Sequence, residues 1–171
     1  MQLSNQPEVW LRGPIPEISA LLQPAAHALL QTSEELRKWL DGFENEKLWL
    51  KPAGRANVGF HLQHMTGVLD RMMTYAKEQG LSKEQFDYLE LEGVADERIE
   101  LKALIKTFEE QVAEALSYFK TLTPEVLLQT RKVGRKELPS TTLGLLFHAA
   151  EHSQRHLGQL LVTVSVLSLK S

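Results

Sequence analysis

Four long segments of this chain repeat their apolar residues every three or four positions, which is the spacing of one face of an α-helix. They predict helices over residues 24–41, 57–78, 96–121 and 140–166. Pro24 suits a first helical turn, and Asn57 and Ser140 can cap the second and fourth helices. The strand signal is weak, since only RKVGRKEL (131–138) could form a small hairpin. Four long helices in 171 residues imply an all-α fold, a four-helix bundle.

The segments between these helices read as connections within one domain that covers residues 1–171. Residues 1–16 are rich in proline and predict an irregular N-terminal arm. Residues 43–56 read as a loop, and residues 78–96 as a connector that contains two glycines. The sequence shows no internal repeat and no second domain.

Charge and the lack of cysteine restrict the function classes. The net charge is −3, whereas nucleic acids and anionic membranes favour a basic surface, so neither is an expected partner. Without cysteine, the chain cannot form disulfides, thiolate zinc sites, iron–sulfur clusters or cysteine nucleophiles. The first residues lack the pattern of a signal peptide, and the apolar stretch 157–169 is too short to span a bilayer. We therefore expect a cytoplasmic protein.

Three of the six histidines lie four residues apart, at His148, His152 and His156. A step of four residues turns an α-helix by about 40°, so these side chains share one face. No charged residue falls within that face, and Glu151 and Arg155 lie at its edge. Because a solvated helix face usually carries charges, this face predicts the lining of a cleft.

A second histidine cluster, His61 and His64, lies on the predicted helix 57–78. Polar residues of this helix are confined to a narrow stripe, which indicates a mostly enclosed helix, and His64 shares a face with Gly67 and Arg71. Two helices that each present histidines to a bundle interior are how bundle-core metal sites are built. The alternative is a set of hydrogen-bonded core histidines, and the spacing alone leaves both interpretations open.

Two stretches, NVGFHLQHMTGVLDR (57–71) and HAAEHSQRHLGQ (148–159), resemble the DinB-like (DinB/YfiT) metalloenzyme family. The resemblance implies an up-down-down-up four-helix bundle and a metal site made of His64, His152 and His156. It implies a divalent ion, zinc or nickel, and three neutral imidazoles with open positions would also suit iron. Many members of the family are dimers, so we expect a homodimer.

Five further residues are candidates for supporting roles around this site. His61 and His148 lie one helical turn before the expected ligands and could orient them by hydrogen bonds. Gln159 could bond a water on the metal or a substrate, or be a helix-packing amide. Arg71 could meet an anionic substrate group, but a salt bridge with Asp70 or a neighbour is favoured; His27 could point into the site or bond locally.

The resemblance also implies an activity class. Relatives include S-transferases that use low-molecular-weight thiols such as bacillithiol, and a mycothiol-dependent isomerase. We therefore expect a metal-dependent enzyme of thiol S-transferase type that acts on a small molecule, with a metal-dependent hydrolase as the alternative. A non-catalytic metal-binding stress-response bundle is the competing class, because no residue stands out as a general base. No His-Glu-x-x-His or Glu-x-x-His sequence is present, which argues against zincin-type proteolysis and a ferritin-like di-iron site.

Overall fold

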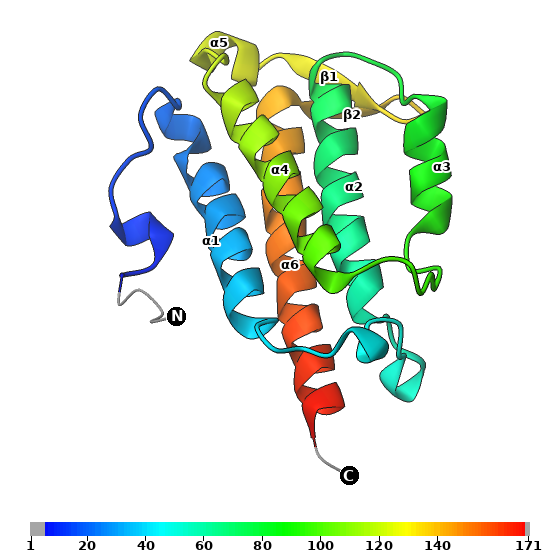
Figure 1. The fold of residues 1–171 in the computed structure, drawn as a ribbon. Helices are drawn as coiled ribbons and strands as arrows, with labels where there is room; N and C mark the ends of the chain where they lie inside the picture. Colours follow the sequence, from blue (N-terminus) through cyan, green and yellow to red (C-terminus); the bar gives the residue numbers. More distant parts are fainter. Residues whose placement is uncertain (1–5, 170–171) are drawn as a thin grey trace.

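The computed structural model describes residues 6–169, and its four longest helices lie side by side (Figure 1). These helices are α1 (Gln23–Trp39), α2 (Val58–Ala76), α4 (Leu101–Phe119) and α6 (Thr142–Ser168). Helix α6 packs against α1 and α2, and α4 packs against the same two helices. The expected mostly helical fold is thus confirmed. Helices α2 and α6, which carry the two histidine clusters, are direct neighbours.

Helices α2 and α6, which carry the two histidine clusters, begin at side-chain caps. Asn57 caps α2 as predicted, since its Oδ1 accepts a hydrogen bond from the backbone N–H of Phe60 at 2.6 Å. Helix α6 is capped by Thr141 rather than by the predicted Ser140, and the Thr141 hydroxyl accepts from the backbone N–H of Gly144 at 3.0 Å. The caps fix where each helix starts and therefore which way its histidines face.

Helix α4 begins at Leu101, later than the predicted start near residue 96. Residues 96–99 form a turn instead, in which the backbone N–H of Ile99 donates to the carbonyl of Asp96 at 3.1 Å. The first N–H of the helix, that of Leu101, donates to Oδ1 of Asn45 at 2.7 Å. A side chain distant in the sequence therefore helps to set this helix start, which local patterns could not show.

The connections contain short elements that the sequence predicted only in part. The expected hairpin is confirmed as β1 (Thr130–Val133) and β2 (Leu138–Thr141), which pair antiparallel. The predicted connector 78–96 contains a helix, α3 (Lys83–Leu91), whose N-terminus is held by a capping box between Ser82 and Gln85. The remaining elements are α5 (Pro124–Leu127) and the 3-10 helices η1 (Val9–Leu11), η2 (Ala20–Leu22), η3 (Asn45–Lys47) and η4 (Pro52–Gly54). Residues 1–5 of the predicted arm lie outside the described residues.

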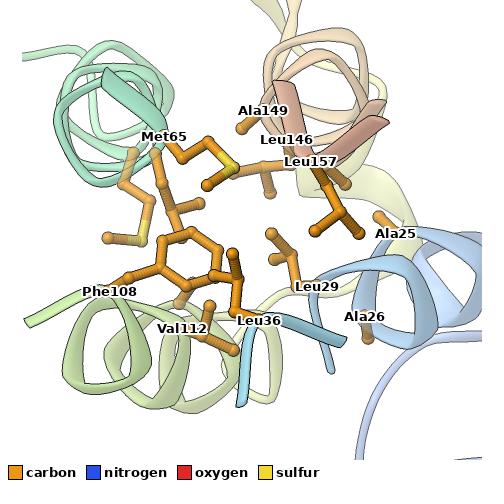
Figure 2. Close-up of a cluster of buried hydrophobic side chains, with 14 of the residues drawn as sticks. Ala25, Ala26, Leu29, Leu36, Met65, Phe108, Val112, Leu146, Ala149 and Leu157 are labelled. Atoms are coloured by element: carbon orange, nitrogen blue, oxygen red, sulfur yellow. The ribbon is translucent and has the colours of Figure 1, made fainter. Parts of the chain in front are cut away.

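The core lies between the four long helices, where apolar side chains from all of them meet (Figure 2). Leu29 of α1, Met65 of α2, Phe108 of α4 and Leu146 of α6 are each fully buried. Helix α2 buries side chains on most of its surface, which confirms the expectation of an enclosed helix. Because this core holds α2 against α6, it also holds the two histidine clusters together.

Replacing Phe108 with alanine is expected to lower the free energy of unfolding by about 3–5 kcal/mol, since the ring is fully buried and its loss leaves a cavity. Urea unfolding followed by circular dichroism measures this change. The matched control is Phe86→Ala on α3, where the ring is 40% exposed and the loss should be much smaller. Equal losses in the two variants would contradict the described core.

None of the helices within residues 6–169 combines the length and the apolar character needed to cross a bilayer.

Candidate metal centre

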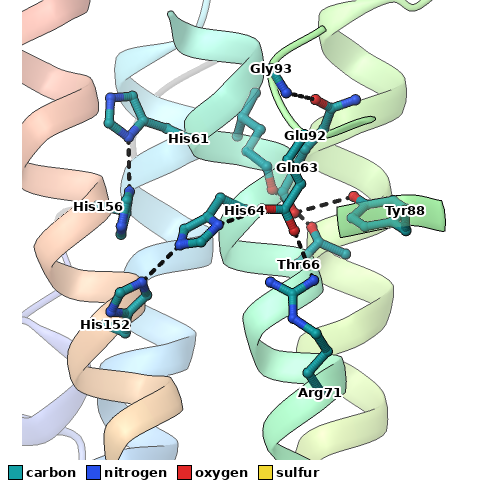
Figure 3. Close-up of polar contacts among 11 residues, drawn as sticks. His61, Gln63, His64, Thr66, Arg71, Tyr88, Glu92, Gly93, His152 and His156 are labelled. Atoms are coloured by element: carbon teal, nitrogen blue, oxygen red, sulfur yellow. Dashed lines mark hydrogen bonds and ion pairs between the residues drawn. The ribbon is translucent and has the colours of Figure 1, made fainter. Parts of the chain in front are cut away.

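Three histidines converge where α2 packs against α6 (Figure 3). His64 from α2 and His152 and His156 from α6 each offer a ring nitrogen, and these nitrogens all lie within 4.8 Å of one another. Nε2 of His64 is 3.0 Å from Nε2 of His152. His156 is buried, whereas the side chain of His64 is 20% exposed, so the cluster is reached from solvent on one side. Three imidazoles arranged in this way could hold one metal ion.

A buried ion pair contacts His64 on the side of the ring opposite to His152. Nδ1 of His64 lies 2.5 Å from Oε2 of Glu92, and Oε1 of the same carboxylate accepts a hydrogen bond from Arg71 at 2.8 Å. The side chains of Glu92 and Arg71 are only 3% and 8% exposed. The carboxylate therefore keeps the proton of His64 on Nδ1 and leaves Nε2 free to act as a ligand, which is the usual carboxylate–histidine–metal arrangement.

Two glycines make room for this arrangement. A Cβ on Gly67 would clash with Oε1 of Glu92 and with the Arg71 guanidinium, so a larger residue there would push the ends of both side chains out of their present contact. Gly93 has a φ of +78°, and a Cβ there would lie 2.9 Å from Phe60. The ring of Phe60 stacks on that of His64 with a centroid separation of 5.0 Å. The segment that carries Glu92 can thus lie close to α2.

His61 contacts His156 in a similar way from the other end of the cluster (Figure 3). The Nδ1 atoms of the two rings are 3.0 Å apart, and His61 is 2% exposed. One of these nitrogens must donate to the other, and if His156 donates, its Nε2 remains free for an ion. A supporting contact by His61 was expected, and the structure places it on His156.

The ring of His152 lies close to both other rings of the cluster. Its ring centroid lies 5.1 Å from that of His64 and 4.5 Å from that of His156. Its Nδ1 is buried and has no hydrogen-bond partner among the described residues. Its Nε2, which faces His64, is therefore the nitrogen through which His152 meets the other ligand candidates. The donor set of three imidazoles fits a divalent transition metal.

Three of these histidines, His61, His152 and His156, are held uncharged near neutral pH. Burial, with a further contribution from neighbouring His64, lowers the pKa of His156 to about 3 and that of His152 to about 4. Burial likewise lowers the pKa of His61 to about 4. Neutral imidazoles are the form that binds metal, so no proton has to leave these rings near neutral pH.

The metal-free protein is expected to lose stability as the pH falls from about 6.5 to about 4. In that window the unfolded chain, with ordinary histidines, binds protons that folded His61, His152 and His156 do not bind. Urea unfolding at pH 7.5, 6, 5 and 4 measures the loss, and a His61→Gln variant should lose stability less steeply. Equal slopes in the two proteins would show that His61 does not contribute.

Of the other residues predicted to support the site, only some lie near the three histidines. His148 is exposed and lies 3.6 Å from Glu151, outside the three-histidine cluster. Gln159 is exposed on α6 and is therefore not a packing amide, while contact with a substrate stays a prediction. Nε2 of His27 lies 3.1 Å from the carbonyl oxygen of Gly13, so this ring contacts the N-terminal arm and is not part of the cluster. Arg71 forms a salt bridge, as favoured, although its partner is neither Asp70 nor another helix residue but Glu92.

Glu92 was missed because it lies in a segment that read as a connector. Its sequence signal was the capping-box pair Ser82 and Gln85, which predicts a short helix that could return the chain to α2. Two hydrogen bonds to Gln63 hold this segment against α2. The side-chain Oε1 of Gln63 accepts from the backbone N–H of Gly93 at 2.7 Å, and the backbone carbonyl of Gln63 accepts from the Tyr88 hydroxyl at 3.2 Å.

Comparison with known proteins gives one family. A family model described as the DinB superfamily matches residues 28–160, which include all of α2 and α4 and most of α6. All three histidines of the cluster lie within the matched residues. No curated protein matches the chain.

Proposed function

We propose, since the chain belongs to the DinB superfamily, that it binds a divalent metal ion through His64, His152 and His156 and uses that ion in an enzyme reaction. The observation that carries this proposal is the convergence of three ring nitrogens within 4.8 Å, from two helices that are far apart in the sequence. The rings form two contacting pairs, His61 with His156 and His64 with His152, but pairing alone does not require ligand atoms of three rings to gather within 4.8 Å.

The surrounding residues support ligand roles for the three histidines. Glu92 fixes the tautomer of His64, and His61 can do the same for His156. The low pKa values of His152 and His156 keep both rings neutral at physiological pH. We propose zinc or nickel as the ion, with iron as a further fit to an all-imidazole donor set.

We further propose that the reaction is a thiol S-transfer to a small molecule. A divalent ion held by three histidines would keep open positions and would lower the pKa of a thiol or a water bound there. Glu92 is engaged on both oxygens by Arg71 and His64, and Glu151 is engaged on one oxygen by Arg155. A thiol whose pKa is lowered in this way would release its proton to solvent water and would need no protein base, whereas hydrolysis of an amide or ester gains from one.

Partly exposed His64 and His152 mark where a small molecule would enter, with the buried ring of His156 behind them and the half-buried ring of Phe60 beside them. Phe60 stacks on His64 and excludes water from that side. Glu92 and Arg71 neutralise each other, so they add no net charge beside the ion. A neutral, partly apolar surround of this kind suits a small organic acceptor.

The experiment is a turnover assay of zinc- and nickel-loaded protein with low-molecular-weight thiols and electrophilic acceptors. Metal-dependent consumption of thiol, lost in a His152→Ala variant, is expected. Cleavage of esters or amides without thiol turnover would favour the hydrolase. Tight metal binding with no turnover of either kind would leave a metal-binding protein and overturn the enzyme proposal.

We also propose a helix order, a cellular location and an oligomeric state. The four long helices are proposed to run up-down-down-up, and the protein is proposed to act in the cytoplasm as a homodimer. Exposed apolar side chains on α6, Val162 and Val166, support a second copy packing there. Light scattering coupled to size-exclusion chromatography measures the oligomeric state, and a monomer at all concentrations would contradict the dimer.

A further inference from the structure

A second group of metal-ligating side chains adjoins the three-histidine cluster on α6. His148, Glu151 and His152 each offer one ligand atom, and these atoms also lie within 4.8 Å of one another. They follow the spacing His-x-x-Glu-His, which places both histidines one turn apart on one helix face with the carboxylate beside them. This group is distinct from the proposed site but shares one residue with it, His152.

The shared residue makes a continuous row of rings from the surface to the interior. The ring centroid of His152 lies 5.1 Å from that of His148 and 4.5 Å from that of His156. The side chain of His148 is 48% exposed, and His156 is 9% exposed. An ion that reaches His148 from solvent is therefore one ring away from His152, and His152 is one ring away from the buried end of the cluster.

Glu151 is oriented toward this row. Its Oε1 accepts a hydrogen bond from Nε of Arg155 at 2.9 Å, while its Oε2 lies 3.6 Å from Nδ1 of His148. One oxygen of Glu151 thus remains available to a cation. The nearby guanidinium of Arg155 repels cations, so binding in this group would be weak.

The two groups cannot both be filled through the same nitrogen of His152. Nε2 of His152 faces His64 at 3.0 Å, and a nitrogen of the same ring lies within 4.8 Å of ligand atoms of His148 and Glu151, so one ring serves both groups. A weak, exposed group that shares its innermost ligand with a buried one is suited to capture an ion and pass it on.

We propose that His148, Glu151 and His152 form an entry site for a divalent cation, which captures the ion from solvent and delivers it to His64 and His156 through the shared His152. This inference rests on the proposed metal site. In this scheme His148 and Glu151 speed the uptake of metal but are not ligands in the final complex.

The test is the rate at which metal-free protein takes up Co²⁺, followed in a stopped-flow instrument by the visible absorption of bound cobalt. His148→Ala and Glu151→Gln are expected to load on the order of tenfold more slowly than wild type, since a local capture site raises association rates. Both variants should reach the final spectrum and stoichiometry of wild type. His27→Ala, which removes a histidine on α1 away from this row, is the control and should load at the wild-type rate.

A second arm isolates the entry site at equilibrium. The His64→Ala/His156→Ala variant should still bind Co²⁺ weakly, and adding His148→Ala should remove that binding. Wild-type loading rates in His148→Ala, or two ions bound at once in wild type, would overturn the entry site. Absence of tight cobalt binding by wild type would instead overturn the proposed metal site itself, so the two failures are distinguishable.

Discussion

Purified His64→Ala protein is expected to contain no stoichiometric metal, whereas the wild type is expected to contain one ion per chain. His64 is the one member of the cluster supplied by α2, and without it only His152 and His156 of α6 remain. Loss of a direct ligand should weaken binding by more than the roughly 10–100-fold that follows loss of a residue that only orients a ligand. Elemental analysis and competition with a chromophoric chelator measure the change.

Two further variants complete this experiment. His152→Ala is expected to behave like His64→Ala, because it also removes one of the three ligand candidates. His27→Ala removes a histidine that contacts Gly13 instead, and it should retain one ion per chain. Equal metal content in His64→Ala and wild type would show that the ligands are other residues. Loss of metal in His27→Ala would show that the histidines act through stability and not through coordination.

Glu92→Gln is expected to lower metal affinity by about 10–100-fold and the free energy of unfolding by about 3–5 kcal/mol. The affinity falls because an amide is a poorer acceptor for the Nδ1 proton of His64. The stability falls because the buried guanidinium of Arg71 loses its anionic partner. Isothermal titration with zinc and urea unfolding measure the two effects on the same preparation.

A double variant separates these effects. In Glu92→Gln/Arg71→Met no buried charge is left without a partner, so much of the stability should return. Metal affinity should stay low, since the carboxylate behind His64 is still missing. Recovery of metal affinity together with stability would contradict the orienting role of Glu92 and would assign it to the fold alone.

The sequence predicted the parts of this protein that depend on short-range patterns. The 3–4 spacing of apolar residues located α1, α2, α4 and α6, because burial of one helix face imposes that period. The charge-free face around His152 and His156 indicated an enclosed surface, and His156 is buried. Which histidines meet across two helices came from the family resemblance, since periodicity gives faces but not pairings.

The parts that escaped prediction depend on contacts between distant segments. Glu92 reaches His64 because α3 folds back on α2; the capping-box pair Ser82 and Gln85 indicates a short helix, but no sequence pattern indicates which side chain of α2 it meets. The choice of His156 as the partner of His61 depends on the vertical offset of two helices, which periodicity does not specify. Gln159 shares the predicted histidine face but is exposed, because that face extends beyond the part covered by α2.

The most direct test of the metal site is a crystal structure of zinc-loaded protein with anomalous diffraction measured on both sides of the zinc absorption edge. The account predicts one strong anomalous peak bounded by the ring nitrogens of His64, His152 and His156, with Glu92 still on Nδ1 of His64. A fully occupied peak elsewhere, or no peak at the cluster in protein that carries stoichiometric zinc, would contradict it.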